Sequence, residues 1–288
     1  MPAPPRHHRG TLTVLRSRRY PPGVSVRIGL ALGGGAALGL AHIGVLRVLS
    51  EEGIHVDCVA GTSAGSVIGA AHCAGRSWKE IWEAARRLEW SHVVSLTFPR
   101  QGMMRLDRLE RYVQAMTGTL DFADLLIPFA AVATDLERGE QVVFTTGSVA
   151  KAVRASCSVP GLFEPLRDGD ASLVDGGLVN DVPADVARAA LGADIVIGVN
   201  LHSHKLQSGP PRNIFDIAYY TFDILLANAG QKGMTSADLL VSPNLQGFHY
   251  RNLKKADELV DRGEQAMRES LGELKRLIAG GQRQRSNA

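Results

Sequence analysis

The chain has 288 residues, 45% of them hydrophobic, and a formal net charge of +3. This supplies enough apolar material for the core of one large domain. The N-terminal residues lack the apolar stretch of a secretory signal, and no apolar run reaches the roughly 18 residues that span a bilayer. These features argue against an exported or membrane-spanning protein. We therefore expect a cytoplasmic protein, with peripheral contact to a membrane surface left open.

Arginines gather at both ends of the chain, which favours affinity for anionic surfaces without naming one. The terminal stretches "MPAPPRHHRG" and "GGQRQRSNA" are rich in Pro, Gly and Arg, a composition typical of mobile, solvated tails. We predict a basic, mobile extension over 1–26, a domain over 27–279 and a tail over 280–288. Within the domain, the core motifs occupy 27–190 and a helical C-terminal part occupies 210–279.

The first two predicted elements of the domain are strands that each end in a glycine turn. "VRIGLAL" at 26–32 precedes three glycines and a helical pattern over 38–53. "HVDCVAG" at 55–61 runs into "GTSAG" and a second helical pattern over 66–75. Because two strand-turn-helix units follow each other, a parallel sheet covered by helices is expected.

The next segments have different patterns. Residues 77–118 predict two helices joined by a looser apolar segment, and 127–144 predict two strands around the turn "LERGE". A helix follows in 147–163 and is stopped by Pro160. "ASLVDGGLVNDVP" at 171–183 predicts a short strand that enters a glycine turn.

The last part of the chain continues the helix and strand alternation. Residues 182–201 predict a helix followed by a buried strand, 213–230 a largely buried helix and 253–280 an exposed terminal helix. The whole order predicts an α/β fold, a three-layer sandwich with a mainly parallel central sheet flanked by helices. The three cysteines form no C-x-x-C pair and are interpreted as buried packing residues: Cys58, Cys73 and Cys157.

The turn Gly61-Thr62-Ser63-Ala64-Gly65 matches G-x-S-x-G, in which a strand reverses sharply into a helix. Glycines two positions away on each side, Gly61 and Gly65, let the turn close and present the Ser63 hydroxyl at a helix N-terminus. The pentapeptide alone is a weak signal. The apolar strand before it and the helix after it favour Ser63 as a nucleophile.

The loop "GGGAALG" that opens the first helix allows two interpretations. A dinucleotide fingerprint would require glycine at position 38, which is Leu38, although Gly39 gives a looser spacing. In the second interpretation, the loop is an oxyanion hole: the backbone amides of Gly34, Gly35 and Ala36 point into one site and bind a developing oxyanion. We favour the oxyanion loop and keep nucleotide binding, supported by the position of Glu51 and Glu52, as the minor interpretation.

A serine nucleophile needs a base, and the histidines follow no pattern that marks a catalytic imidazole. His202 and His204, in "NLHSH", have the chain position of a hydrolase triad histidine and stay an alternative. Asp175, at the end of a predicted strand and before Gly176 and Gly177, is the better candidate. Asp181 is the other aspartate that could serve as the base.

Four blocks in order, "GGGAALGLAHIG", "GTSAG", "ASCSVPGLFEP" and "DGGLVNDVP", resemble the patatin-like phospholipase family. The resemblance covers about 27–190. It implies a Ser-Asp dyad, with Ser63 as nucleophile and Asp175 as base. It also implies an oxyanion hole at Gly34, Gly35 and Ala36. The supporting glycines of these motifs are Gly33, Gly39, Gly61, Gly65, Gly176 and Gly177.

The resemblance further implies hydrolysis of acyl esters of phospholipids, lysophospholipids or other lipids, without a cofactor or metal. A lipid substrate and no nucleic-acid partner are expected, and the oligomeric state is left open. One position departs from the family: Leu38 replaces the usual Arg or Lys before the last glycine of the first block. The alternative function is a catalytically silent lipid-binding or regulatory module on the same scaffold.

Large apolar side chains interrupt the regular α/β pattern between 78 and 104. Their adaptable shapes suggest a flexible lid or acyl-chain wall, with ordinary core packing as the alternative. These residues are Trp78, Trp82, Trp90, Phe98, Met103 and Met104. The apolar helix with Phe215, Tyr219, Phe222 and Leu226 is interpreted as core packing, with a second wall or a dimer face left open.

Overall fold

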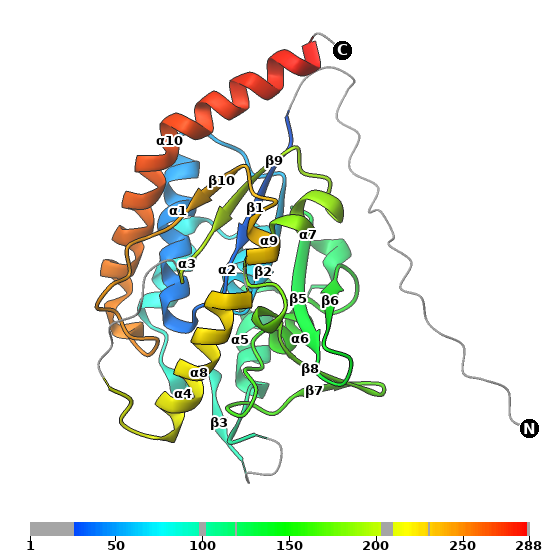
Figure 1. Ribbon diagram of the computed structural model, residues 1–288, viewed down its shortest axis with the longest axis vertical. Coiled ribbons are helices and arrows are strands. Elements are labelled where there is room, and N and C mark those ends of the chain that lie inside the picture. The colour runs from blue at the N-terminus through cyan, green and yellow to red at the C-terminus, as the bar shows by residue number, and fades with distance from the viewer. Residues whose placement is uncertain (1–25, 98–101, 119, 203–209, 230, 287–288) are drawn as a thin grey trace, which may run out of the picture.

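The computed structural model describes residues 26–97, 102–118, 120–202, 210–229 and 231–286 (Figure 1). The extension predicted over 1–26 therefore lies outside the described residues, apart from Val26. Within them, a large sheet has the order β10-β9-β1-β2-β5-β8-β7, and β6 pairs with β5. Its strands are β1 (Ile28–Leu32), β2 (Cys58–Thr62), β5 (Phe129–Asp135), β6 (Glu140–Phe144), β7 (Leu166–Asp168), β8 (Ala171–Asp175), β9 (Ile195–Val199) and β10 (Leu239–Val241).

Helices surround this sheet. They are α1 (Ala41–Glu51), α2 (Ala64–Cys73), α3 (Trp78–Arg86), α4 (Trp90–Val93), α5 (Asp107–Thr117), α6 (Val149–Ser156), α7 (Ala184–Ala189), α8 (Ile214–Ala229), α9 (Gln231–Met234) and α10 (Ala256–Ser286). Short turns of 3-10 helix are η1 (Ala36–Leu40), η2 (Phe122–Asp124), η3 (Gly176–Leu178) and η4 (Leu253–Lys255). In a separate two-stranded sheet, β3 (Ser95–Leu96) pairs antiparallel with β4 (Met104–Arg105).

The central strands are buried on both faces and divide their side chains between two cores. In β1, Leu30 and Leu32 face the larger core, which contains residues of α1, α2, α5 and α10. Ala31, with the opposite orientation, packs in a smaller core with Val186 and Ala187 of α7. The sheet therefore lies between two helical layers, and the predicted α/β class with a mainly parallel sheet is confirmed.

The pairing of β5 brings two distant segments together. Thr62 of β2 pairs with Val132, and Asp175 of β8 pairs with Ala133. β6 pairs with both Val132 and Ala133, so it occupies the other edge of β5. A strand residue pairs with one neighbouring strand on each side. Since β6 occupies one side of β5, β2 and β8 must lie end to end along the other side of β5. Ser63, which follows β2, is thereby placed beside the end of β8.

The structure corrects several predicted elements. The described residues between 77 and 118 form α3, α4, α5 and the paired strands β3 and β4, not two helices alone. β10, which we did not predict, adds a parallel edge strand beside β9. α10 is not simply exposed, since Leu259 and Met267 are buried; it lies beside α1 and continues past Ala279 to Ser286 (Figure 1).

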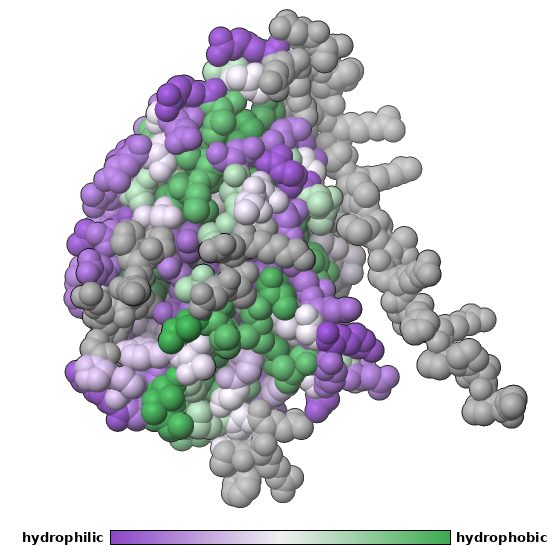
Figure 2. Space-filling model, viewed as in Figure 1, coloured by the Kyte–Doolittle hydropathy of each residue, from purple (hydrophilic) through white to green (hydrophobic). Residues whose placement is uncertain are grey.

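The helix α8 was predicted to be largely buried, but only one of its faces is. Tyr219, Phe222 and Leu226 are buried, whereas Ile214, Ile217 and Ile224 expose 61%, 50% and 61% of their surface. Figure 2 shows strongly hydrophobic residues at the surface over this helix. Among the helices of the described residues, none is long and apolar enough to cross a bilayer.

Candidate active site

Ser63 sits in a sharp turn between β2 and α2. Its φ is +51°, a left-handed conformation that non-glycine residues rarely adopt and that costs of order 1–3 kcal/mol. The Ser63 amide donates to Ser156 Oγ at 2.8 Å, and Ser156 Oγ donates to the Val132 carbonyl at 2.5 Å. A Cβ on Gly65 would lie 2.1 Å from the Leu32 carbonyl oxygen. Strand, turn and helix are thus packed too closely for a larger residue at Gly65.

Asp175 lies fully buried at the end of β8. Its Oδ1 accepts a hydrogen bond from the Gly177 amide at 2.9 Å, while no group in the described residues meets hydrogen-bond geometry at Oδ2. Burial raises the pKa of Asp175 to about 7, although the nearby Ser63 hydroxyl and the Gly177 amide lower it. The Ser63 hydroxyl therefore lies close enough to the carboxyl group of Asp175 to affect its pKa.

The glycine loop passes over Ser63. A Cβ on Gly34 would lie 3.3 Å from the Ser63 Cβ and 3.9 Å from its Oγ. Gly35 and Ala36 both have positive φ, +149° and +50°. Across the residues that the structure describes, the amides of these two residues have no hydrogen-bond acceptor, whereas the Ala37 amide donates to the Tyr250 carbonyl at 3.1 Å. The free amides of Gly35 and Ala36 are therefore suited to bind an oxyanion.

Gly34 differs from its neighbours, because its amide donates to Asp181 Oδ1 at 3.0 Å. The predicted third donor is thus engaged in the resting structure. Leu38, at the position where the related family has a cation, is fully buried, and its amide donates to the Gly35 carbonyl at 3.0 Å. The loop is held by apolar packing and backbone bonds.

His202 and two carboxylates form a buried group beside this loop. His202 Nε2 lies 3.8 Å from Asp181 Oδ2, and its Nδ1 lies 2.7 Å from Asp223 Oδ1 of α8, outside ideal hydrogen-bond angles. Burial lowers the pKa of His202, but Asp181 and Asp223 outweigh this effect and raise it to about 9. A protonated imidazole cannot accept the proton of Ser63. His204, the other histidine considered as a base, lies outside the described residues.

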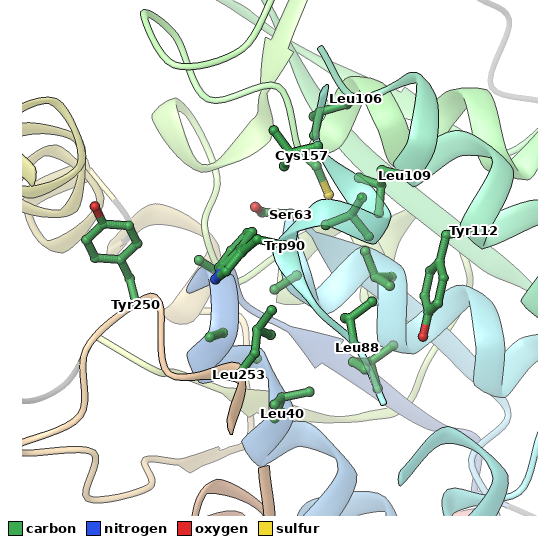
Figure 3. A pocket seen from close by; sticks show the side chains of 18 of the residues that line it. Leu40, Ser63, Leu88, Trp90, Leu106, Leu109, Tyr112, Cys157, Tyr250 and Leu253 are labelled. Atoms are coloured by element: carbon green, nitrogen blue, oxygen red, sulfur yellow. The ribbon is translucent and has the colours of Figure 1, made fainter. Parts of the chain in front are cut away.

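Ser63 lines an apolar cavity. Its volume is about 480 Å³, and its walls come from α2, α3, α4, α5, η1 and the α8 region (Figure 3). Ala64, Val67, Ile68 and Ala71 line it along successive turns of α2. Because a helix rises 1.5 Å per residue, the cavity follows α2 for roughly 10 Å beyond the serine. Its apolar lining matches a hydrocarbon chain and not a nucleotide.

Only some of the predicted lid residues line the cavity. Trp90 and Met104 line the cavity, which agrees with an acyl-chain wall. Trp78 and Trp82 do not: Arg47 stacks over Trp78, and the Trp82 indole donates to Asp257 of α10 at 2.9 Å. Met103 packs with the α8 cluster, and Phe98 lies outside the described residues. In α8, Phe215 and Tyr219 line the cavity, as the alternative of a second wall predicted.

Sequence comparison gives one family. The family model described as patatin-like phospholipase matches residues 30–188. An uncharacterized NTE family protein of Mycobacterium tuberculosis is 30% identical over 272 residues, which cover 85% of this chain and 46% of the relative. Patatin-like phospholipase domain-containing protein 6 of Mus musculus is 38% identical over 187 residues, 61% of this chain and 14% of that protein. The chain thus spans less than half the length of these two relatives.

Structural comparison gives the same fold. The crystal structure of VipD from Legionella pneumophila is similar with a TM-score of 0.53, covering 86% of this chain and 67% of that chain. The sequence identity is 13%, so the likeness concerns the fold alone.

Proposed function

The chain belongs to the patatin-like phospholipase family, and from this premise we propose that it is a serine hydrolase of lipid carboxylic esters. The observation that carries the proposal is the position of Ser63. It lines a 480 Å³ apolar cavity, next to a buried carboxylate and to two amides that have no acceptor among the residues described. This arrangement can hold an acyl chain with its ester carbonyl at the serine.

The mechanism follows from these positions. Asp175 accepts the Ser63 proton while Ser63 Oγ attacks the ester carbonyl, and the Gly35 and Ala36 amides bind the oxyanion of the tetrahedral intermediate. Collapse of the intermediate breaks the bond to the leaving alcohol, which takes the proton from Asp175. A water molecule then gives its proton to Asp175 and hydrolyses the acyl-enzyme, releasing the fatty acid and restoring the Ser63 hydroxyl.

The direct test uses the purified chain with a fluorophosphonate probe and with acyl esters of increasing chain length. Covalent labelling together with hydrolysis of the longer esters supports the proposal. A folded chain that binds these lipids but neither labels nor hydrolyses would instead support a silent lipid-binding module on the same scaffold.

The substitution Ala71→Phe is expected to restrict the substrate to short acyl chains. Ala71 lines the cavity two turns of α2 beyond Ser63, so a phenyl ring there fills the space needed by the distal carbons of a long chain. The kcat/KM for a hexadecanoyl ester should fall at least about tenfold relative to that for a butanoyl ester. Ala115→Phe, on the exposed side of α5, is the matched control, and equal loss for both esters would contradict an acyl-chain cavity.

The exposed face of α8 is proposed to contact the lipid surface that holds the substrate. Phe215, on the opposite side of this helix, lines the cavity, so contact of the exposed face with lipid would place the cavity close to the lipid surface. Ile217→Asp/Ile224→Asp should lower binding to phosphatidylglycerol vesicles at least about tenfold in a sedimentation assay. Leu136→Asp, at a residue 50% exposed in the turn after β5, should leave binding unchanged. Equal binding by all three proteins would refute this contact.

A further inference from the structure

The direction of the amides of Gly35 and Ala36 depends on how the loop before them is fixed. Hydrogen bonds anchor its start: the Gly33 amide donates to the Val199 carbonyl at 3.1 Å, the Gly34 amide donates to Asp181 Oδ1 at 3.0 Å, and His42 Nε2 contacts the Gly33 carbonyl oxygen at 2.8 Å. The first is a strand contact. The second is made by a side chain, so the position of the Asp181 carboxylate sets the orientation of the Gly34 peptide and, through it, of the amides that follow.

The Asp181 carboxylate is itself held in place by His202. Its carboxylate is buried, and His202, whose side chain is 4% exposed, lies between it and Asp223. Asp181 follows η3, His202 follows β9 and Asp223 belongs to α8, so this single imidazole connects three segments around the loop. A buried carboxylate without a compensating charge costs several kcal/mol, so the imidazolium stabilises Asp181 in its ionised form.

We propose that His202 is a positioning residue, which holds the carboxylate of Asp181 in place and so orients the oxyanion-binding amides of Gly35 and Ala36. The inference rests on the proposed hydrolase function. His202 stays protonated and does not exchange protons with substrate. Asp223 completes the arrangement by tying α8, a wall of the acyl-chain cavity, to the same imidazole.

Several charged and titratable groups lie around His202. Asp181 and Asp223 contact it, Asp175 lies near enough for His202 to lower its pKa, and His202 also lowers the pKa of His42 of α1. Burial raises the pKa of the Tyr219 hydroxyl of α8 well above its usual range, and the same three carboxylates raise it further, so this hydroxyl stays neutral. His42 Nε2 contacts the Gly33 carbonyl oxygen at 2.8 Å, and burial lowers the pKa of His42 to about 4, so His42 is neutral. His202 is thus the cation that offsets the carboxylates of this group.

The test is a double-mutant cycle on the charge pair. His202→Gln should lower the fluorophosphonate labelling rate, and kcat for a butanoyl ester, about tenfold or more with little change in KM, because the amides lose their alignment while the cavity is intact. The acid limb of the pH profile should move to higher pH, since His202 no longer lowers the pKa of Asp175. The neutral pair Asp181→Asn/His202→Gln should recover kcat to within about threefold, because Asn keeps an acceptor for the Gly34 amide.

Controls separate the possible outcomes. His55→Gln, which removes an exposed histidine 3.5 Å from Asp57, should behave as the wild type. If His202→Gln does not fold, Asp223→Asn removes only the second carboxylate and should shift kcat in the same direction. An active wild type with an unchanged His202→Gln variant, or with no recovery in the double variant, overturns the positioning role. An inactive, folded wild type overturns the proposed function itself, and the positioning role with it.

Discussion

Ser63→Ala is expected to abolish fluorophosphonate labelling and to lower ester hydrolysis at least about 10³-fold. Two nearby serine hydroxyls are not free to replace it. Ser66 Oγ donates to the Ser63 carbonyl at 2.6 Å, and Ser156 Oγ donates to the Val132 carbonyl at 2.5 Å. Both hydroxyls are therefore committed to the backbone of the turn. Mass spectrometry of the labelled protein checks the site of attachment.

Ser66→Ala is the matched control for this experiment, because it removes a buried hydroxyl three residues away. It should cost about 1 kcal/mol of stability through the lost hydrogen bond but keep the labelling. Labelling of the Ser63→Ala variant, or hydrolysis at the wild-type rate, would show that another residue is the nucleophile.

Asp175→Asn should lower kcat by roughly 10²–10⁴-fold, the range for loss of a general base. In the wild type, kcat/KM should rise as the pH passes through about 7, because only the ionised carboxylate accepts the Ser63 proton. A pH–rate profile of both proteins measures this. An Asp175→Asn variant with wild-type activity would exclude Asp175 as the base.

The same substitution should stabilise the fold at high pH. The pKa of Asp175 is raised from 3.8 to about 7, so the folded chain binds this proton more tightly than the unfolded chain does. The resulting stability is complete below pH 3.8 and is lost as the pH rises to about 7, a difference of order 4 kcal/mol. The amide side chain in the Asp175→Asn variant stays neutral and avoids this loss. Urea unfolding at pH 8 should therefore show the variant to be more stable, with little difference at pH 4.

Local signals in the sequence are enough to predict the strands and helices next to Ser63. Apolar runs that end in glycine mark β1 and β2, and the apolar spacing after them marks α1 and α2. Contact between β2 and β8 could not be derived that way, because it depends on the register of both strands on β5. The pairing of Ser63 with Asp175 was predicted only from the resemblance to a family. The register of β2 and β8 on β5 explains why the two residues lie close together.

The buried group around His202 escaped prediction. Asp181, His202 and Asp223 are far apart in the chain, and charged residues in or beside loops usually point into solvent. The prediction for α8 was wrong for another reason. Apolar residues on all sides of a helix predict that it is buried, yet Ile214, Ile217 and Ile224 face solvent. β10 did leave a signal, the apolar triplet 239–241 shortly before Pro243.

The glycines around the site have a consequence for how such chains evolve. A Cβ on Gly65 would lie 2.1 Å from the Leu32 carbonyl oxygen, and one on Gly176 would lie 2.2 Å from the Val132 carbonyl oxygen. Selection for a stable chain therefore preserves these glycines whether or not any ester is cleaved. A descendant that lost the Ser63 hydroxyl would keep the glycine blocks for many generations. If Ser63 and Asp175 form the proposed dyad, these two side chains, and not the glycines, would distinguish a working enzyme from a silent descendant.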